Sequence, residues 1–229
     1  MQLIVLWDVD HTLVDNAGVS KEIYASAFKA LAGRDAELPA PTEGRTDRAI
    51  MREMFVRHDL PVPAWASAQR ALEEAGRGRE EDLRRRGRVL PGVQEALKAL
   101  AADSEICSSV LTGNIAANAR VKLGAFGLDG LLDMSVGGYG EDSEDRARLV
   151  DAARARIHAA YGTAMMTPTV LIGDTPRDVQ AAHDTGARCI AVASGIHSVA
   201  ELRAAGADFV VPDLTDRDGL LDHLRAAAA

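Results

Sequence analysis

The stretch that decides the fold is LIVLWDVDHTLVD, residues 3–15. Its first five residues are apolar, and an apolar run of this length that ends in polar residues is typical of a buried parallel strand. Side chains alternate along a strand, so Asp8 and Asp10 are predicted to leave its carboxyl end on the same side. Open α/β sheets bind ligands at this edge. Two carboxylates so close together repel each other, and the stretch therefore predicts a cation or hydrogen-bond donors beside them.

Length and composition limit the class of protein. A chain of 229 residues corresponds to one large domain, or to a core with a smaller insertion. Its formal net charge of -8 argues against nucleic acid as the main partner, because duplex binding requires a basic face. No apolar run approaches the roughly 18 residues of a membrane span, and no basic region of a signal peptide precedes the first apolar run. Cys107 and Cys189 lie in apolar runs and resemble buried thiols, so we expect a cytoplasmic protein.

The pattern of apolar residues divides the chain. Residues 16–88 show helical periodicity and no convincing strand, with helices expected over 19–32 and 65–76. After residue 88 strands alternate with helices, which predicts a parallel sheet with right-handed crossovers. We therefore predict an α/β protein. Residues 1–15 and 89–229 form a Rossmann-like, doubly wound core, and residues 16–88 form an α-helical cap over the carboxyl ends of the strands. The later strands are predicted at residues 106–111, 131–136, 169–173, 189–193 and 209–211.

Carboxylates follow two of these strands. Asp8 and Asp10 end the first strand, and Asp174 ends the strand at 169–173, with Asp178 one helical turn further on. The carboxyl ends of parallel strands lie along one edge of a sheet, so these acids are expected to meet. Three or four carboxylates suit a hard divalent cation with oxygen ligands, and Mg²⁺ is the expected ion.

The strand at 106–111 ends in Thr112, Gly113 and Asn114, before a helix predicted to begin at Asn114. The threonine hydroxyl and the two backbone N–H groups at a helix start suit phosphate oxygens. An aspartate beside Mg²⁺ and a phosphoryl group is a candidate nucleophile, and the second aspartate of a pair can transfer protons. The pattern therefore favours phosphoryl chemistry.

Three of these segments, residues 8–12, 112–114 and 173–178, resemble in order and spacing the first, second and fourth motifs of the haloacid dehalogenase-like hydrolase superfamily. The helical insertion and residues 90–93 (LPGV) resemble its phosphoglycolate phosphatase-like branch. The resemblance implies that Asp8 is the nucleophile and a metal ligand, and that Asp10 is the general acid/base with its backbone carbonyl on the metal. It also implies that Thr112 binds phosphate, that Asp174 is a metal ligand, and that Asp178 supports the metal's water shell.

Two positions depart from the family pattern. His11 stands where the family usually has glycine, and a positive φ there would strain its backbone. The family's third motif is a lysine or arginine early in the helix before the fourth motif, and only Arg146 and Arg148 are available. Arg146 is favoured because it precedes Leu149, which is expected to face the sheet, by three residues. Its guanidinium is predicted to bridge Asp8 and the phosphate.

In the cap, the polar loop at residues 43–48 is expected to reach the site. Arg45 and Thr46 are its candidates for contact with the substrate's leaving group. Thr46 fits equally well as the N-cap of the following helix.

The predicted function is that of a Mg²⁺-dependent phosphatase that hydrolyses a small phosphorylated metabolite through an aspartyl-phosphate. A sugar phosphomutase similar to β-phosphoglucomutase would use the same residues and stays open as the alternative. A dehalogenase is disfavoured because it requires neither the second aspartate nor a metal. A non-catalytic ligand-binding relative would be expected to have lost one of Asp8, Asp10 or Asp174, and all three are present. The sequence leaves the substrate and the oligomeric state open.

Overall fold

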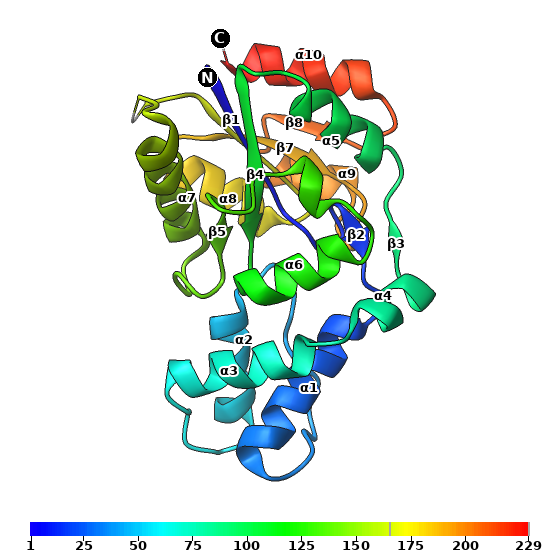
Figure 1. Cartoon of the computed structure of the whole chain (residues 1–229), viewed down its shortest axis with the longest axis vertical. Helices are drawn as coiled ribbons and strands as arrows, with labels where there is room; N and C mark the ends of the chain where they lie inside the picture. The colour runs from blue at the N-terminus through cyan, green and yellow to red at the C-terminus, as the bar shows by residue number, and fades with distance from the viewer. Residues whose placement is uncertain (165, 229) are drawn as a thin grey trace.

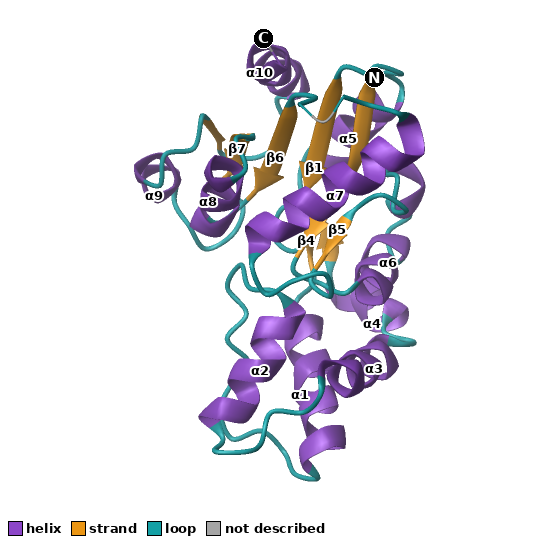
Figure 2. Ribbon diagram, turned by 90° about the vertical axis from the view of Figure 1, so that its left-hand side faces the viewer, coloured by secondary structure: helices purple, strands orange, loops and turns teal. Residues whose placement is uncertain are grey.

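A six-stranded parallel sheet forms the centre of the computed structural model, which describes residues 1–164 and 166–228. The strand order is β5-β4-β1-β6-β7-β8, so the strand predicted from the opening stretch, β1 (Leu3–Trp7), lies inside the sheet (Figure 2). It pairs in parallel with β4 (Ile106–Thr112) on one side and β6 (Thr169–Gly173) on the other. Every residue of β1 is buried, which explains why its sequence is continuously apolar.

The two faces of β1 belong to different hydrophobic clusters. Leu3, Val5 and Trp7 pack in one cluster, and Ile4 and Leu6 pack in the other. Helices α5 (Val93–Ala101), α6 (Ala116–Gly124) and α10 (Arg217–Ala228) contribute to the first cluster, and α7 (Arg146–Tyr161), α8 (Pro176–Asp184) and α9 (Val199–Ala204) to the second. The predicted α/β fold with helices on both faces of a parallel sheet is confirmed.

One predicted strand is wrong. Residues 131–136 form no strand; a short 3₁₀ turn, Asp129–Leu131, precedes them, and the edge strand is β5 at Gly138–Tyr139. The apolar side chains of Leu132, Met134 and Val136 are buried from a loop, so their pattern reflects burial without strand pairing. Gly138 pairs with Leu111 of β4, and its lack of a side chain permits the close approach of α7, because a Cβ on Gly138 would be 2.2 Å from the carbonyl oxygen of Leu149. The remaining strands are β7 (Arg188–Val192) and β8 (Phe209–Val211).

Four helices stand apart from the sheet, below it in Figure 1. They have a hydrophobic cluster of their own that includes Phe28, Met54 and Leu72, together with Ile115 from the core. The chain enters and leaves this region through an antiparallel ribbon of β2 (Val14–Asp15) and β3 (Arg88–Val89). The predicted boundaries after residue 15 and before residue 89 fall at this ribbon. The helices are α1 (Val19–Ala32), α2 (Asp47–Arg57), α3 (Trp65–Gly76) and α4 (Glu80–Arg86).

Within the described residues, no helix combines the length and the apolar character that crossing a membrane requires.

The turn before α5 gives a test of the packing. Gly92 has φ 77° and a Cβ there would lie 2.0 Å from the carbonyl oxygen of Leu214, whereas Gly33 has φ 72° with open space around it. We expect Gly33→Ala to cost about 1–2 kcal/mol of unfolding free energy through left-handed backbone strain alone. Gly92→Ala should cost about 1–3 kcal/mol more, because the methyl group also forces backbone apart. Urea unfolding of both variants measures the difference, and equal losses would contradict the predicted close approach.

Candidate active site

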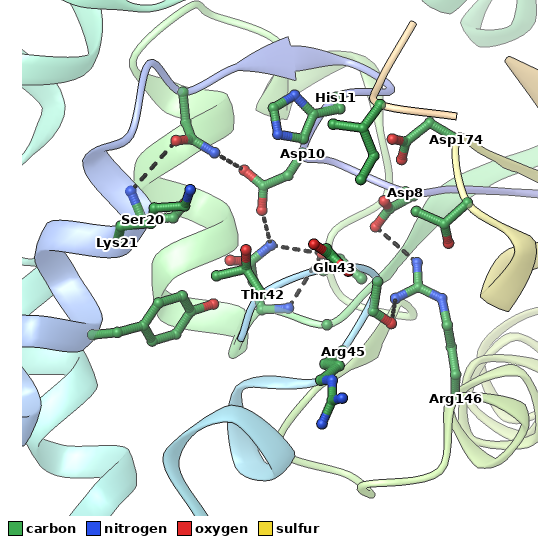
Figure 3. Close-up of a pocket in the computed structure, with 18 of the residues that line it drawn as sticks. Asp8, Asp10, His11, Ser20, Lys21, Thr42, Glu43, Arg45, Arg146 and Asp174 are labelled. Carbon is green, nitrogen blue, oxygen red and sulfur yellow. Dashed lines mark hydrogen bonds and ion pairs between the residues drawn. The ribbon is translucent and has the colours of Figure 1, made fainter. Parts of the chain in front are cut away.

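A cavity of about 250 Å³ opens at the carboxyl ends of the strands, between the sheet and the four helices (Figure 3). Core residues that follow β1, β4 and β6 line one side of it, and residues of α1 and the loop 42–45 line the other. Asp8, Asp10 and Asp174 all face this cavity, as their positions after parallel strands predict. The two segments of the chain therefore share one site.

Asp8 is held against an arginine. The Arg146 Nη2 atom lies 2.9 Å from Asp8 Oδ1 and 2.6 Å from Asp178 Oδ1. Arg146 Nε also donates a hydrogen bond of 2.8 Å to Asp178 Oδ1. All three side chains are buried, whereas Arg148 is exposed and pairs with Asp151. Arg146 is therefore the arginine of this helix that contacts Asp8.

The guanidinium retains donor capacity. The Arg146 Nη2 atom is paired with both carboxylates, whereas Nη1 makes one long contact of 3.5 Å, with the carbonyl oxygen of Gly44. A buried donor of this kind favours an additional acceptor, and an oxygen of a bound anion in the cavity would supply one.

Asp8, Asp174 and Asp178 form a cluster in which one oxygen of each lies within 4.8 Å of the others. Burial raises the pKa of Asp8 to about 7, although the Arg146 charge counteracts it, and burial with the nearby Asp8 charge raises the pKa of Asp174 to about 9. Asp178 has partners on both oxygens, since its Oδ2 accepts hydrogen bonds from the backbone N–H and hydroxyl of Thr175. Asp174, by contrast, makes no ion pair within residues 1–164 and 166–228. A cation would relieve this excess of buried negative charge.

Asp10 lies in a different environment from Asp8. Its Oδ2 accepts hydrogen bonds from Lys122 Nζ at 2.6 Å and Asn114 Nδ2 at 2.8 Å, and its Oδ1 accepts one from Asn16 Nδ2 at 2.7 Å. Burial opposes ionisation of Asp10, but the Lys122 charge and these hydrogen bonds outweigh it and lower the pKa of Asp10. The two acids of the first motif therefore have separate cations.

Lys122 was not predicted from the sequence as a site residue. Its side chain is only 2% exposed, an unusual state for lysine. The signal was present in the spacing, because Lys122 follows the sheet-facing Ala119 by three residues in α6 and thus lies on its inner face. Without knowledge of its partner, a lysine in a helix is expected to lie at the surface.

The helix that follows β4 begins later than the sequence predicted. Helix α6 begins at Ala116, two residues later than predicted, and the N–H of Asn114 donates to Thr112 Oγ1 at 3.2 Å. The predicted placement of the Asn114 N–H at a free helix start is therefore wrong. Thr112 Oγ1 also accepts a hydrogen bond of 2.7 Å from Asn114 Nδ2. With both acceptor positions in use, the Thr112 hydroxyl proton is available to an acceptor in the cavity.

The amino end of α6 is instead capped by carboxylates. The N–H of Ile115 donates to Asp47 Oδ2 at 2.9 Å, and that of Ala116 donates to Glu141 Oε2 at 2.6 Å. Asp47 comes from α2 and also accepts a 2.6 Å hydrogen bond from the Tyr24 hydroxyl. Burial raises the pKa of Asp47 to about 6. The N–H groups at the start of α6 are thus bound by one carboxylate from the helical region and one from the core, whose negative charge suits this end of a helix.

Gly113 lies where the two parts of the site touch. A Cβ on Gly113 would be 2.1 Å from the carbonyl oxygen of Arg45, and its own carbonyl accepts a 2.6 Å hydrogen bond from the Asp47 N–H. Only glycine permits this approach of two backbones.

The two predicted substrate contacts of the loop 43–48 have different surroundings. Arg45 lines the cavity, but its guanidinium is directed away from Asp8 and pairs with Glu53 at 3.3 Å (Figure 3). Thr46 is buried outside the cavity lining and is the N-cap of α2, where its hydroxyl accepts a hydrogen bond from the N–H of Ala49. Their predicted roles in substrate binding stay predictions.

His11 has φ 63°, so the turn after β1 does require the left-handed conformation that glycine usually supplies. Its side chain is exposed and lines the cavity (Figure 3). The positive φ considered at this position is therefore observed, whereas a role of His11 in substrate contact stays a prediction.

Comparison with known proteins agrees with this arrangement. Residues 5–192 match the family described as "Haloacid dehalogenase-like hydrolase". The chain belongs to this family. It is therefore a hydrolase of the haloacid dehalogenase-like type, and the resemblance drawn from its motifs is confirmed.

Individual relatives cover almost the whole chain. The chain is 27% identical over 226 residues to "Probable phosphatase IndB" of Dickeya dadantii (strain 3937), with 94% of this chain and 92% of that protein aligned. The structure is similar to that of a predicted phosphatase from Clostridium acetobutylicum, with a TM-score of 0.67, 19% identity, and coverage of 97% and 99% of the two chains. It is also similar to a predicted phosphoglycolate phosphatase from Haemophilus somnus 129pt, with a TM-score of 0.64, 18% identity, and coverage of 96% and 98%.

The raised pKa of Asp174 predicts a pH effect on stability. Its pKa is about 9 in the folded protein and near 3.8 ordinarily, so between these values the folded state keeps a proton that the unfolded state loses. The contribution of Asp174 to stability therefore falls as pH rises through this window, by at most about 1.4 kcal/mol per pH unit. Asp174→Asn removes this penalty, and its unfolding free energy relative to wild type should be higher at pH 8 than at pH 5. Urea unfolding in EDTA at both pH values measures this, and a pH-independent difference would contradict it.

Proposed function

We propose that the protein is a Mg²⁺-dependent phosphatase that hydrolyses a small phosphorylated metabolite through an aspartyl-phosphate on Asp8. One observation carries the proposal. The Asp8 carboxylate faces the cavity beside Asp174, in contact with the guanidinium of Arg146, while Asp10 is held separately by Lys122. This arrangement around one cavity supports Asp8 as the nucleophile, Arg146 as the cationic group for phosphoryl oxygens and Asp10 as the acid/base.

In the first step, a carboxylate oxygen of Asp8 attacks phosphorus and the bond to the ester oxygen breaks. The leaving oxygen takes a proton from the protonated form of Asp10 and departs as an alcohol, which leaves Asp10 ionised. In the second step, water transfers a proton to Asp10 and its oxygen attacks the aspartyl-phosphate. The bond between phosphorus and Asp8 then breaks, which releases inorganic phosphate and restores both carboxyl groups.

The phosphoryl oxygens would be held by groups that have unused donors. These are the Thr112 hydroxyl and the Nη1 atom of Arg146. Both stand at the edge of the sheet where Asp8 would attack, so they would bind the developing negative charge in fixed positions.

A divalent cation fits the cluster of carboxylates. The oxygens of Asp8, Asp174 and Asp178 converge to within 4.8 Å, and oxygen-only donors of high negative charge favour Mg²⁺ over softer metals. Asp8 and Asp174 would hold the ion, with the Asp10 backbone carbonyl as the expected third ligand and Asp178 beside them. Bound there, Mg²⁺ would screen the repulsion between the Asp8 carboxylate and the phosphate dianion.

Replacement of the nucleophile tests the proposal directly. Asp8→Asn should lower the rate of p-nitrophenyl phosphate hydrolysis with Mg²⁺ by about 10⁴-fold or more, because no acyl phosphate can form. Asp15→Asn is the matched control, since Asp15 pairs with Arg88 in the β2–β3 ribbon and does not line the cavity. Wild-type turnover by the Asp8 variant would exclude this mechanism.

The metal is tested by chelation and thermal stability. EDTA should abolish hydrolysis, and added MgCl₂ should restore it and raise the Tm of the wild type, because an ion that binds only the folded state stabilises it. The Tm increase should be lost in Asp174→Asn and kept in Asp15→Asn. A scanning-fluorimetry titration measures these shifts, and activity that resists EDTA would rule out the metal requirement.

The products separate hydrolysis from the phosphomutase alternative. With a hexose 1-phosphate, the proposed reaction releases inorganic phosphate, whereas a mutase would form the isomeric sugar phosphate. Product analysis by ³¹P NMR distinguishes them.

A further inference from the structure

We infer that Lys122 is a positioning residue for the acid/base step, which it supports by occupying one oxygen of Asp10 and leaving the other to accept or donate the transferred proton. This inference rests on the proposed phosphatase function and specifies how the carboxylate of Asp10 is oriented. It concerns a buried lysine in α6 that lies outside the sequence motifs of the site.

The donors around Asp10 are distributed unequally. An ionised carboxylate offers about four acceptor positions, two on each oxygen. Both positions on Oδ2 are used, by Lys122 Nζ at 2.6 Å and by Asn114 Nδ2 at 2.8 Å. Oδ1 accepts one hydrogen bond, from Asn16 Nδ2 at 2.7 Å. The free position is therefore on Oδ1, and this oxygen is the one that can exchange a proton with the leaving group or with water.

Lys122 is fixed by more than Asp10. Its Nζ also donates to Asn114 Oδ1 at 2.5 Å, so Lys122, Asp10 and Asn114 form a closed ring of hydrogen bonds. Asn114 in turn donates to Thr112 Oγ1 at 2.7 Å. These hydrogen bonds connect the orientation of the Asp10 carboxylate with that of the Thr112 hydroxyl, which is the proposed phosphate contact.

The buried ammonium group of Lys122 requires a partner that compensates its loss of hydration, and Asp10 is that partner. The Lys122 side chain is 2% exposed, and removing an ammonium group from water is costly unless it is paired. Its ion pair with Asp10 is placed beside the cavity, where the Asp10 side chain keeps 25% of its surface accessible. The pairing with Asp10 compensates the burial of the Lys122 ammonium group, and because Asp10 lines the cavity, this pairing also fixes a carboxylate of the candidate site.

The test compares two substrates that differ in their leaving group. Phenolate is a poorer leaving group than p-nitrophenolate, so phenyl phosphate depends more strongly on protonation of the departing oxygen. Lys122→Met should lower kcat/KM for phenyl phosphate at least about tenfold more than kcat/KM for p-nitrophenyl phosphate, because Asp10 is then misdirected. This ratio is independent of the fraction of active enzyme, so partial misfolding does not change it.

Three further variants complete the design. Lys122→Arg keeps the charge and the donors and should return the ratio to within about threefold of the wild type. Lys98→Met makes the same replacement at an exposed lysine of α5 and should leave the ratio unchanged. If Lys122→Met does not fold, Lys122→Gln should shift the ratio in the same direction.

The outcomes separate the two proposals. An equal loss for both substrates, or no loss, in the Lys122→Met or Lys122→Gln variant would overturn the positioning role while the phosphatase function stands. A wild-type protein that hydrolyses neither ester with Mg²⁺ would overturn the proposed function, and the inference with it.

Discussion

The constraint on which this site depends is the mutual repulsion of buried carboxylates. Asp8 and Asp10 are two residues apart at the end of a fully buried strand, and Asp174 joins them from the neighbouring strand. The chain meets this constraint by giving Asp8 and Asp10 different cations. Arg146 from α7 pairs with Asp8, and Lys122 from α6 pairs with Asp10. Each cation lowers the pKa of its aspartate, but burial outweighs Arg146 and raises the pKa of Asp8, whereas Lys122 and the hydrogen bonds outweigh burial and lower the pKa of Asp10.

This division gives two chemically similar side chains different tasks. Asp8 lies in the cluster of three carboxylates, where a divalent cation would complete the charge balance. Asp10 is outside that cluster and is held by neutral amides and one ammonium group. The proposed nucleophile and the proposed acid/base therefore differ through the residues that surround them, although both come from one tripeptide.

The helical region contacts the site through backbone hydrogen bonds as well as through side chains, one of which caps a helix of the core. Asp47 caps α6 of the core, accepts a hydrogen bond from Tyr24 of α1, and donates its N–H to the carbonyl of Gly113. The loop after β4 is thus fixed by contacts with the helical region.

The sequence by itself determined the elements that depend on local pattern. The apolar run of β1, the alternation of helices and strands after residue 88, and the positions of Asp8, Asp10 and Asp174 after parallel strands follow from periodicity and from the geometry of a parallel sheet. The same reasoning selected Arg146 over Arg148, because helical spacing fixes which face a residue occupies.

The tertiary structure decided what depends on contacts between distant segments. The edge strand at Gly138–Tyr139 pairs with β4 across more than twenty residues of sequence, and α7 packs closely on its glycine, neither of which a local pattern encodes. Lys122 meets Asp10 across 112 residues of sequence, and Asp47 takes the helix end that was expected to face phosphate. Burial of a charged group is favourable only when its partner is present, and the identity of that partner is set by packing in three dimensions.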